Sequence, residues 1–120
     1  MRYLIPLLLF AFLPLQSASA QVEAPISAVE ITEWNWYTEP DFGTDGAVRW
    51  VAQVKNTSDR AIYQAELKLT TLDEDGSVIT TDVGLVQNIP PGGVAATEDR
   101  ADLYGNEAKA RIRVIQVYYE

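Results

Sequence analysis

The side chains in this sequence that could perform chemistry are mostly carboxylates. The chain of 120 residues contains 17 aspartates and glutamates, but no histidine and no cysteine. It therefore lacks the imidazole base, the thiol nucleophile and the zinc–thiolate ligands that many enzymes use. Two carboxylates can hydrolyse a glycoside when they face each other across a cleft, but a compact domain of this size rarely forms a deep one. We expect no enzymatic activity and no cofactor.

Some of the acidic residues form two clusters whose oxygen atoms suit calcium. One cluster contains Asp73, Glu74 and Asp75, and the other lies within residues 98–102. Neither cluster has the ligand spacing of an EF-hand loop. Asp73 and Asp75 are the metal candidates of this sequence. The alternative, which we favour, is that both clusters are solvated residues at a hairpin turn and at a strand end.

Aromatic stacking is the second kind of chemistry that the sequence offers. The candidate ligand-binding residues are Trp34, Trp36, Tyr37 and Phe42. Amide and carboxylate side chains lie between them, as they do where carbohydrate-binding sandwiches stack a sugar ring on an aromatic side chain. Aromatic residues also anchor protein interfaces. The alternative is that the two tryptophans fill the core of a domain that has no disulfide.

The elements that must position these side chains are predicted to be short β-strands. Apolar and polar residues alternate along most of the chain, and no long segment repeats apolar residues at helical spacing. In residues 47–56, for example, every second residue from Val48 to Val54 is apolar. We expect strands in residues 31–40, 47–56, 61–73, 77–86, 94–104 and 110–119, with a break in the fifth near Asp99.

Turn-forming residues separate these segments. They occur in residues 56–60 (NTSDR), 73–76 (DEDG) and 88–93 (NIPPGG). Gly76 suits a position with positive φ, and the Pro91-Gly92 pair suits a type II turn. The residues to which we assign structural roles in turns are Asn56, Asp73, Gly76, Pro90, Pro91 and Gly92.

Whether the two tryptophans face the core depends on how regular the first strand is. Val29 and Ile31 have odd numbers, whereas Trp34 and Trp36 have even numbers. A regular strand places these two pairs on opposite faces, whereas a one-residue bulge near residues 32–33 brings all four side chains onto one face. With the bulge the tryptophans fill the core, and without it they are open to solvent.

The last segment, residues 110–119, also changes its alternation part-way along. Its apolar residues are even-numbered up to Val114 and odd-numbered from Ile115 onward. This change indicates either a bulge or burial of both faces of the strand.

The first 20 residues are predicted to be a secretory signal peptide. Arg2 supplies a positive charge, an apolar run follows, and residues 18–20 (ASA) provide the small side chains of a cleavage site. The apolar run is shorter than the roughly 20 residues that span a bilayer. We expect cleavage after Ala20, no membrane span in the mature form, and a periplasmic or secreted protein. Residues 21–120 then form a single domain.

The charge of residues 21–120 disfavours two classes of partner. This part holds all 17 acidic residues against 8 basic ones once Arg2 is removed, which leaves a net charge of −9. Nucleic acids and anionic membrane surfaces attract basic surfaces, so we expect neither as a partner. The partner that we expect is an unknown envelope or secreted protein, and we expect the chain itself to be a monomer.

Three turn motifs resemble those of the FxLYD domain, a small immunoglobulin-like module of exported bacterial proteins. The matching stretches are residues 54–58 (VKNTS), 73–76 (DEDG) and 89–92 (IPPG). Of the motif that names the family only Asp73 is present, and Leu69 and Leu72 stand at its aromatic positions. The resemblance covers about half of residues 21–120. It implies an immunoglobulin-like fold and no catalytic residues, because the family has no established enzymatic activity.

Together these observations predict an all-β fold. We expect an immunoglobulin-like, two-sheet antiparallel β-sandwich of about seven strands that follows a cleaved signal peptide. The predicted function is that of an exported, non-enzymatic accessory or protein-interaction module of the bacterial envelope or secreted space. The alternative is a carbohydrate-binding module that stacks its ligand on Trp34 and Trp36.

Overall fold

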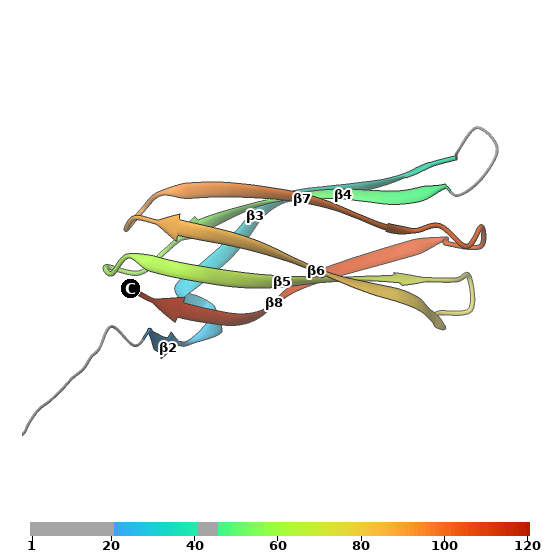
Figure 1. Cartoon of the computed structure of the whole chain (residues 1–120). Helices are drawn as coiled ribbons and strands as arrows, with labels where there is room; N and C mark the ends of the chain where they lie inside the picture. The colour runs from blue at the N-terminus through green and yellow to red at the C-terminus, as the bar shows by residue number, and fades with distance from the viewer. Residues whose placement is uncertain (1–20, 41–45) are drawn as a thin grey trace, which may run out of the picture.

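The computed structural model describes residues 21–40 and 46–120, which form a sandwich of two β-sheets (Figure 1). The predicted signal peptide, residues 1–20, lies outside these residues, and so does Phe42. The strands are β2 (Val22–Ala24), β3 (Val29–Glu39), β4 (Ala47–Asn56), β5 (Ile62–Leu72), β6 (Val78–Ile89), β7 (Val94–Asp102) and β8 (Lys109–Tyr119). One short 3-10 helix, η3 (Ile26–Ala28), joins β2 to β3.

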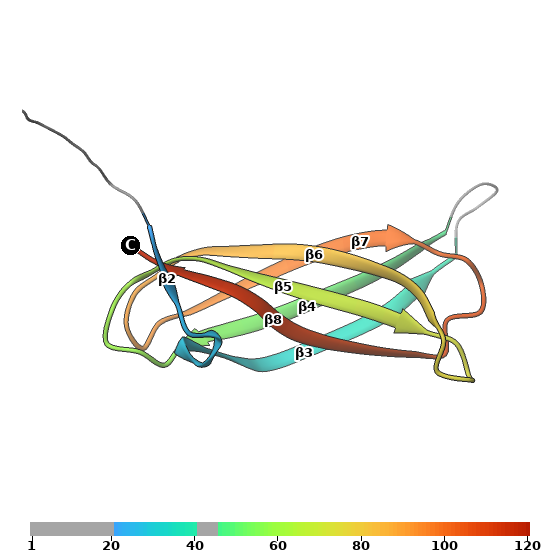
Figure 2. The ribbon, with the colours of Figure 1, turned by 90° about the horizontal axis from the view of Figure 1, so that it is seen from below.

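The two sheets are antiparallel and face each other. One sheet has the strand order β2-β8-β5-β6, and the other has the order β3-β4-β7. Figure 2 shows the two layers from below, with the long strands of both sheets running roughly lengthwise. The prediction of an all-β, two-sheet antiparallel sandwich of about seven strands is confirmed.

The core lies between the sheets and consists of the inward-facing residues of the strands in both sheets. Trp50 and Val54 of β4 are fully buried, as are Leu67 of β5 and Val117 of β8. These side chains come from positions where the sequence alternates between apolar and polar residues, because successive residues of a strand point to opposite faces. The hydrophobic effect thus selects one face of each strand for the core.

The first long strand, β3, contains the bulge on which the position of the tryptophans depends. Its register with β4 shifts between Ile31 and Glu33, so Thr32 is an extra residue. The hydroxyl of Thr32 donates to the backbone oxygen of Gln53 at 3.3 Å. After the shift, Trp34 and Trp36 lie on the same inward face as Ile31, because directly paired antiparallel residues share a face.

The last strand, β8, contains a second bulge, at Ile115. Glu66 of β5 pairs with Gln116, and the next residue, Leu67, pairs with Val114. The change of alternation in this segment therefore reflects a bulge. The bulge keeps both Val114 and Val117 directed toward the core.

Three details of the predicted strands differ from the structure. The segment from Val94 to Asp102 is one continuous strand, so the predicted break near Asp99 is absent. Strand β6 continues to Ile89 and includes Asn88, which has a positive φ of 59°. The short strand β2 has no counterpart among the predicted strands, because three residues are too few to show alternation.

Asn56 is the most connected of the turn residues. It is fully buried. Its Nδ2 donates to the carbonyl oxygens of Arg60 at 2.7 Å and Ile89 at 2.9 Å. Its Oδ1 accepts from the backbone N–H of Ser58 at 2.9 Å and from the hydroxyl of Ser58 at 2.7 Å. The side chain thus ties the end of β4 to the following turn and to the end of β6.

The other two turns use proline and glycine. The backbone N–H of Gly93 donates to the carbonyl oxygen of Pro90 at 2.8 Å, and Gly92 has a φ of +75°. Pro91 and Gly92 thus occupy the two central positions of a type II turn. Gly76 has a φ of +86° in the turn between β5 and β6, a conformation that glycine adopts without strain.

Candidate binding surface

The sheet made of β3, β4 and β7 turns one face to solvent, and this outer face carries polar side chains around a few exposed apolar ones. Tyr37 is 50% exposed, Val51 is 40% exposed and Val94 is 51% exposed. Tyr37 pairs with Arg49, which pairs in turn with Arg100 on β7. Tyrosine and arginine are both enriched in protein interfaces.

A shallow depression of about 520 Å³ lies beside these residues. Its lining comes from all three strands and consists of Glu33, Trp34, Asn35, Val51, Ala52, Gln53 and Ala96. Gln53 pairs with Glu33 on β3 and with Ala96 on β7, so these three side chains form one row across the sheet. The lining therefore combines apolar side chains with amide and carboxylate groups.

Polar contacts hold several side chains of this face in place. The single hydroxyl hydrogen of Thr32 is shared between the backbone oxygen of Gln53 and its Oε1, which lies 3.1 Å from the hydroxyl oxygen. Arg49 donates through Nε to Oε1 of Glu39 at 2.8 Å, and the two form an ion pair. Both side chains are partly exposed, so solvent screens the pair and it contributes little to stability. Its main effect is to fix the guanidinium group beside Tyr37.

The structure separates the four aromatic residues that the sequence grouped together. Trp36 pairs with Trp50, is half-buried and packs against the core. Trp34 pairs with Ala52 on the same inward face, yet it is 36% exposed because β3 lies at the edge of its sheet. Tyr37 faces the opposite way, on the outer face. Among the described residues, Trp34 and Tyr37 are the two candidates whose rings reach solvent most.

The calcium candidates Asp73 and Asp75 lie in the turn between β5 and β6. Oδ1 of Asp73 accepts from the backbone N–H groups of Asp75 and Ser77, each at 2.9 Å. The turn and the segment before β8 enclose a depression of about 360 Å³ that Asp73, Glu74, Asp75 and Glu107 help to line. No group of three acidic side chains in residues 21–40 and 46–120 is arranged to hold a metal ion. Asp73 and Asp75 stay weak calcium candidates, and a solvated hairpin turn stays the favoured interpretation.

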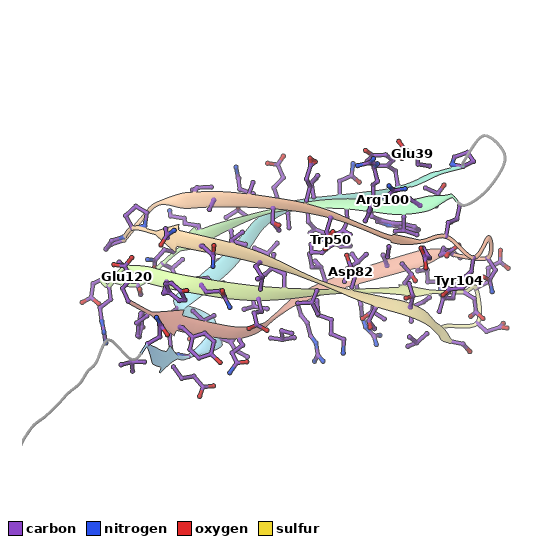
Figure 3. The ribbon with its side chains drawn as sticks, viewed as in Figure 1. Glu39, Trp50, Asp82, Arg100, Tyr104 and Glu120 are labelled. Carbon is purple, nitrogen blue, oxygen red and sulfur yellow. The ribbon has the colours of Figure 1, made fainter. Side chains whose placement is uncertain are left out.

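A contact that sequence reasoning missed joins the two sheets. The indole Nε1 of Trp50 donates to Oδ2 of Asp82 at 2.8 Å, and Figure 3 shows the two side chains pointing toward each other between β4 and β6. Asp99 lies on the same inward face as Trp50, because the two residues are paired. The sequence feature that pointed to this contact is Asp82, a charged residue in the middle of the predicted strand 77–86.

The environment of Asp82 makes its carboxyl group a weaker acid than an exposed aspartate. Partial burial raises the pKa of its carboxyl group, and the hydrogen bond from Trp50 lowers it by a smaller amount. The neighbouring carboxyl group of Asp99 raises the pKa further through charge repulsion and a shared hydrogen bond. The net effect is a pKa above the ordinary value for aspartate.

Gly84 provides the space into which Trp50 reaches. A Cβ atom at this position would lie 2.7 Å from Cη2 and 3.0 Å from Cζ2 of Trp50. The indole therefore packs directly on the backbone of β6, two residues from the aspartate that it contacts.

One finding concerns membranes: within the part of the chain that the structure describes, no helix has the length and apolar character needed to cross a bilayer.

The comparisons with known proteins give the following result. No protein-family model matches the sequence, and no curated protein matches it at a significant level. Among solved structures, that of IrmA from Escherichia coli is similar over 84% of this chain and 79% of that chain, with 13% sequence identity and a TM-score of 0.46.

Proposed function

We propose that this protein is an exported, non-enzymatic interaction module that contacts a protein partner through the outer face of the β3-β4-β7 sheet. The observation that carries the proposal is the exposure of Tyr37, Val51 and Val94 on one sheet face. Interfaces are enriched in tyrosine and arginine at their centre and have a polar rim. This face has both, because Arg49 pairs with Tyr37 and Arg100 follows Arg49 on the next strand.

The sequence supports the exported location. Residues 1–20 have the charge, the apolar run and the small residues of a signal peptide. The turn motifs also resemble those of the FxLYD domain, which is a module of exported proteins. The test is to express the full chain in a bacterium and to measure the intact mass of the product in the periplasmic fraction and the medium. We expect a chain that begins at Gln21; an uncleaved chain in the cytoplasm contradicts export.

The interaction is tested with matched variants on the two sheets. We expect a partner from the envelope or the secreted fraction to copurify with the wild-type protein and to be lost with Tyr37→Ala and with Val51→Gln. Val83→Gln is the matched control, because Val83 is 46% exposed on the outer side of the other sheet. Equal capture by the Val51 and Val83 variants contradicts the proposal.

A carbohydrate ligand is the second candidate for the same region. The observation in its favour is that Trp34 is 36% exposed at the sheet edge and belongs to the lining of the depression, with its ring on the face opposite to the side chains of Asn35 and Gln53. A sugar that stacks on this ring would change its fluorescence, and Trp34→Phe would abolish the change. A glycan screen that leaves the fluorescence of Trp34 unaltered rejects this candidate.

A further inference from the structure

Strand β8 lies at an edge of its sheet over most of its length. It runs from Lys109 to Tyr119, but β2 pairs only with Val117, Tyr118 and Tyr119. In Figure 2, β2 meets β8 only near the C terminus. On the side away from β5, no described strand pairs with residues 109–114.

The chain leaves this edge because of Pro25. Proline has no backbone N–H and cannot continue a ladder, and η3 then carries the chain to β3 in the other sheet. Alternate residues of an edge strand turn their N–H and C=O groups away from their one neighbour. The short pairing with β2 shows that this edge accepts an antiparallel strand.

The apolar residues along the open part of β8 are less covered than those under β2. Val117, where β2 pairs, is fully buried. Ala110, Ile112 and Val114 face the same core but are only partly buried. A strand added beside them would cover these side chains with its own inward-facing residues.

The opposite face of this same stretch is basic. Lys109, Arg111 and Arg113 alternate with the apolar residues, and Lys68 of β5 pairs with Arg113. Lys68, Arg111 and Arg113 line a depression of about 450 Å³. The one ion pair among the described residues is that of Arg49 with Glu39, so none of these basic groups has a carboxylate partner there.

This basic group stands out in a chain whose net charge is −8. It also argues against a second copy of the chain at this edge. If two β8 strands paired in antiparallel fashion through residues 109–114, Arg111 and Arg113 of one copy would face the same basic residues of the other. Like charges placed opposite each other in a sheet are destabilising. Acidic side chains on an added strand are favoured for the same reason.

We propose that residues 109–114 of β8 bind an extended segment of a partner protein as an added antiparallel strand, in which acidic and apolar residues alternate. The backbone of the segment pairs with the free N–H and C=O groups of β8. Its acidic residues lie beside Lys109, Arg111 and Arg113, and its apolar residues lie beside Ile112 and Val114. Strand addition of this kind takes its affinity from the backbone and its specificity from alternate side chains.

This edge is separate from the outer face of the β3-β4-β7 sheet, so the two proposals fail independently. The probe is an eight-residue peptide of alternating glutamate and valine with blocked ends. Added to the purified protein, it is expected to slow amide hydrogen exchange in residues 109–114 and to shift their amide resonances. Tyr37→Ala and Val51→Gln are expected to leave this binding unchanged.

Three control peptides separate strand addition from simple charge attraction. The first has the same composition with its glutamates and valines in two blocks, the second replaces glutamate by lysine, and the third carries methyl groups on alternate amide nitrogens. All three are expected to bind at least about tenfold more weakly, because each removes either the cross-strand pairs or the backbone bonds. Equal binding of any one of them overturns the proposal.

Charge reversal on the protein completes the test. The double variant Arg111→Glu/Arg113→Glu is expected to bind the alternating acidic peptide about tenfold more weakly, since it turns two attractive cross-strand pairs into repulsive ones. Lys55→Glu/Arg100→Glu makes the same change in net charge on the other sheet and is expected to keep the affinity. An equal loss of affinity in both variants overturns the proposal. The proposal is also overturned if the wild-type protein sediments as a dimer in which residues 109–114 are protected from hydrogen exchange.

Discussion

The indole N–H of Trp50 on β4 donates a 2.8 Å hydrogen bond to the carboxylate of Asp82 on β6, and in this way a single buried side chain links the two sheets. The same ring packs on Gly84, two residues further along β6. The contact buries a large aromatic side chain and at the same time gives its only polar atom a hydrogen-bond partner. Trp50 lies 32 residues before Asp82 in the sequence, so the contact joins two distant segments of the chain.

The packing of Trp50 on Gly84 predicts that the two positions are energetically coupled. Gly84→Ala places a methyl group 2.7 Å from Cη2 of Trp50, and we expect a loss of about 1–3 kcal/mol in the free energy of unfolding from overpacking. Phenylalanine at position 50 ends short of this contact. Gly84→Ala should therefore cost less in a Trp50→Phe background.

The measurement is a double-mutant cycle by chemical denaturation. The expected coupling energy is about 1 kcal/mol or more, which exceeds the usual additivity error. Additive effects of the two substitutions would show that the indole does not rest on the backbone of β6.

The raised pKa of Asp82 predicts an unusual pH dependence of stability. Because the folded state holds this proton more tightly than the unfolded chain, whose reference pKa is 3.8, folding is favoured as the pH falls toward that value. The charged form is disfavoured at neutral pH, where burial and the repulsion of Asp99 act on it. Asp99→Asn removes the repulsion and should raise the melting temperature most at neutral pH.

Melting temperatures of the wild type and Asp99→Asn measured between about pH 4 and pH 7 check this prediction. The difference between the two proteins should shrink as the pH falls, because Asp82 becomes protonated in both. Asp102→Asn is the control for the removal of one negative charge from the same strand. A difference that stays constant with pH, or one that Asp102→Asn reproduces, contradicts the coupling of Asp82 with Asp99.

The buried Asn56 predicts a large loss of stability on truncation. Asn56→Ala removes the donor to the carbonyl oxygen of Ile89, which the structure records as a buried bond of 2.9 Å. A buried carbonyl without a partner costs about 1–3 kcal/mol, and the bonds to Arg60 and Ser58 are lost as well. We expect a total of about 3 kcal/mol from urea denaturation.

The control is Asn106→Ala, because Asn106 is exposed between β7 and β8. A surface substitution of this kind should change stability by no more than about 0.5 kcal/mol. If Asn56→Ala behaves like Asn106→Ala, the side chain of Asn56 does not join the strand ends in solution.

The positions of the three tryptophans predict distinct fluorescence. Trp50 is fully buried, Trp36 packs against the core, and Trp34 is 36% exposed. We expect acrylamide to quench Trp34 most and Trp50 least. The proteins to compare are the wild type and the three single variants Trp34→Phe, Trp36→Phe and Trp50→Phe. If Trp36→Phe lowers the quenching as much as Trp34→Phe does, both rings are open to solvent and β3 lacks the bulge at Thr32.

Alternation of apolar and polar residues was enough to predict a sandwich of antiparallel strands. It identified β4 and β5 because each has one buried face, and the hydrophobic effect acts on a period of two residues. It failed for β2, which is too short to show a period. It also placed the end of β6 too early, because Asn88 and Ile89 resemble turn residues in sequence but continue the strand.

The candidate site could be predicted only in part. Alternation alone places Trp34 and Tyr37 on opposite faces of β3, but the sequence could not decide which of these two faces turns toward the core. That assignment depends on the extra residue Thr32, whose hydroxyl bonds to Gln53 on the neighbouring strand. A bulge forms where cross-strand contacts favour it, and cross-strand partners are not adjacent in the sequence.

By itself the sequence determined the class of fold, the lack of histidine and cysteine chemistry and the excess of negative charge. These follow from composition and from short-range alternation, which are properties of the chain. Only the tertiary structure decided that Trp50 meets Asp82, that Arg111 and Arg113 lie on an open edge, and that the Tyr37 ring faces solvent. The physical reason is that strand order and register bring together residues from distant segments, and no local pattern encodes that pairing.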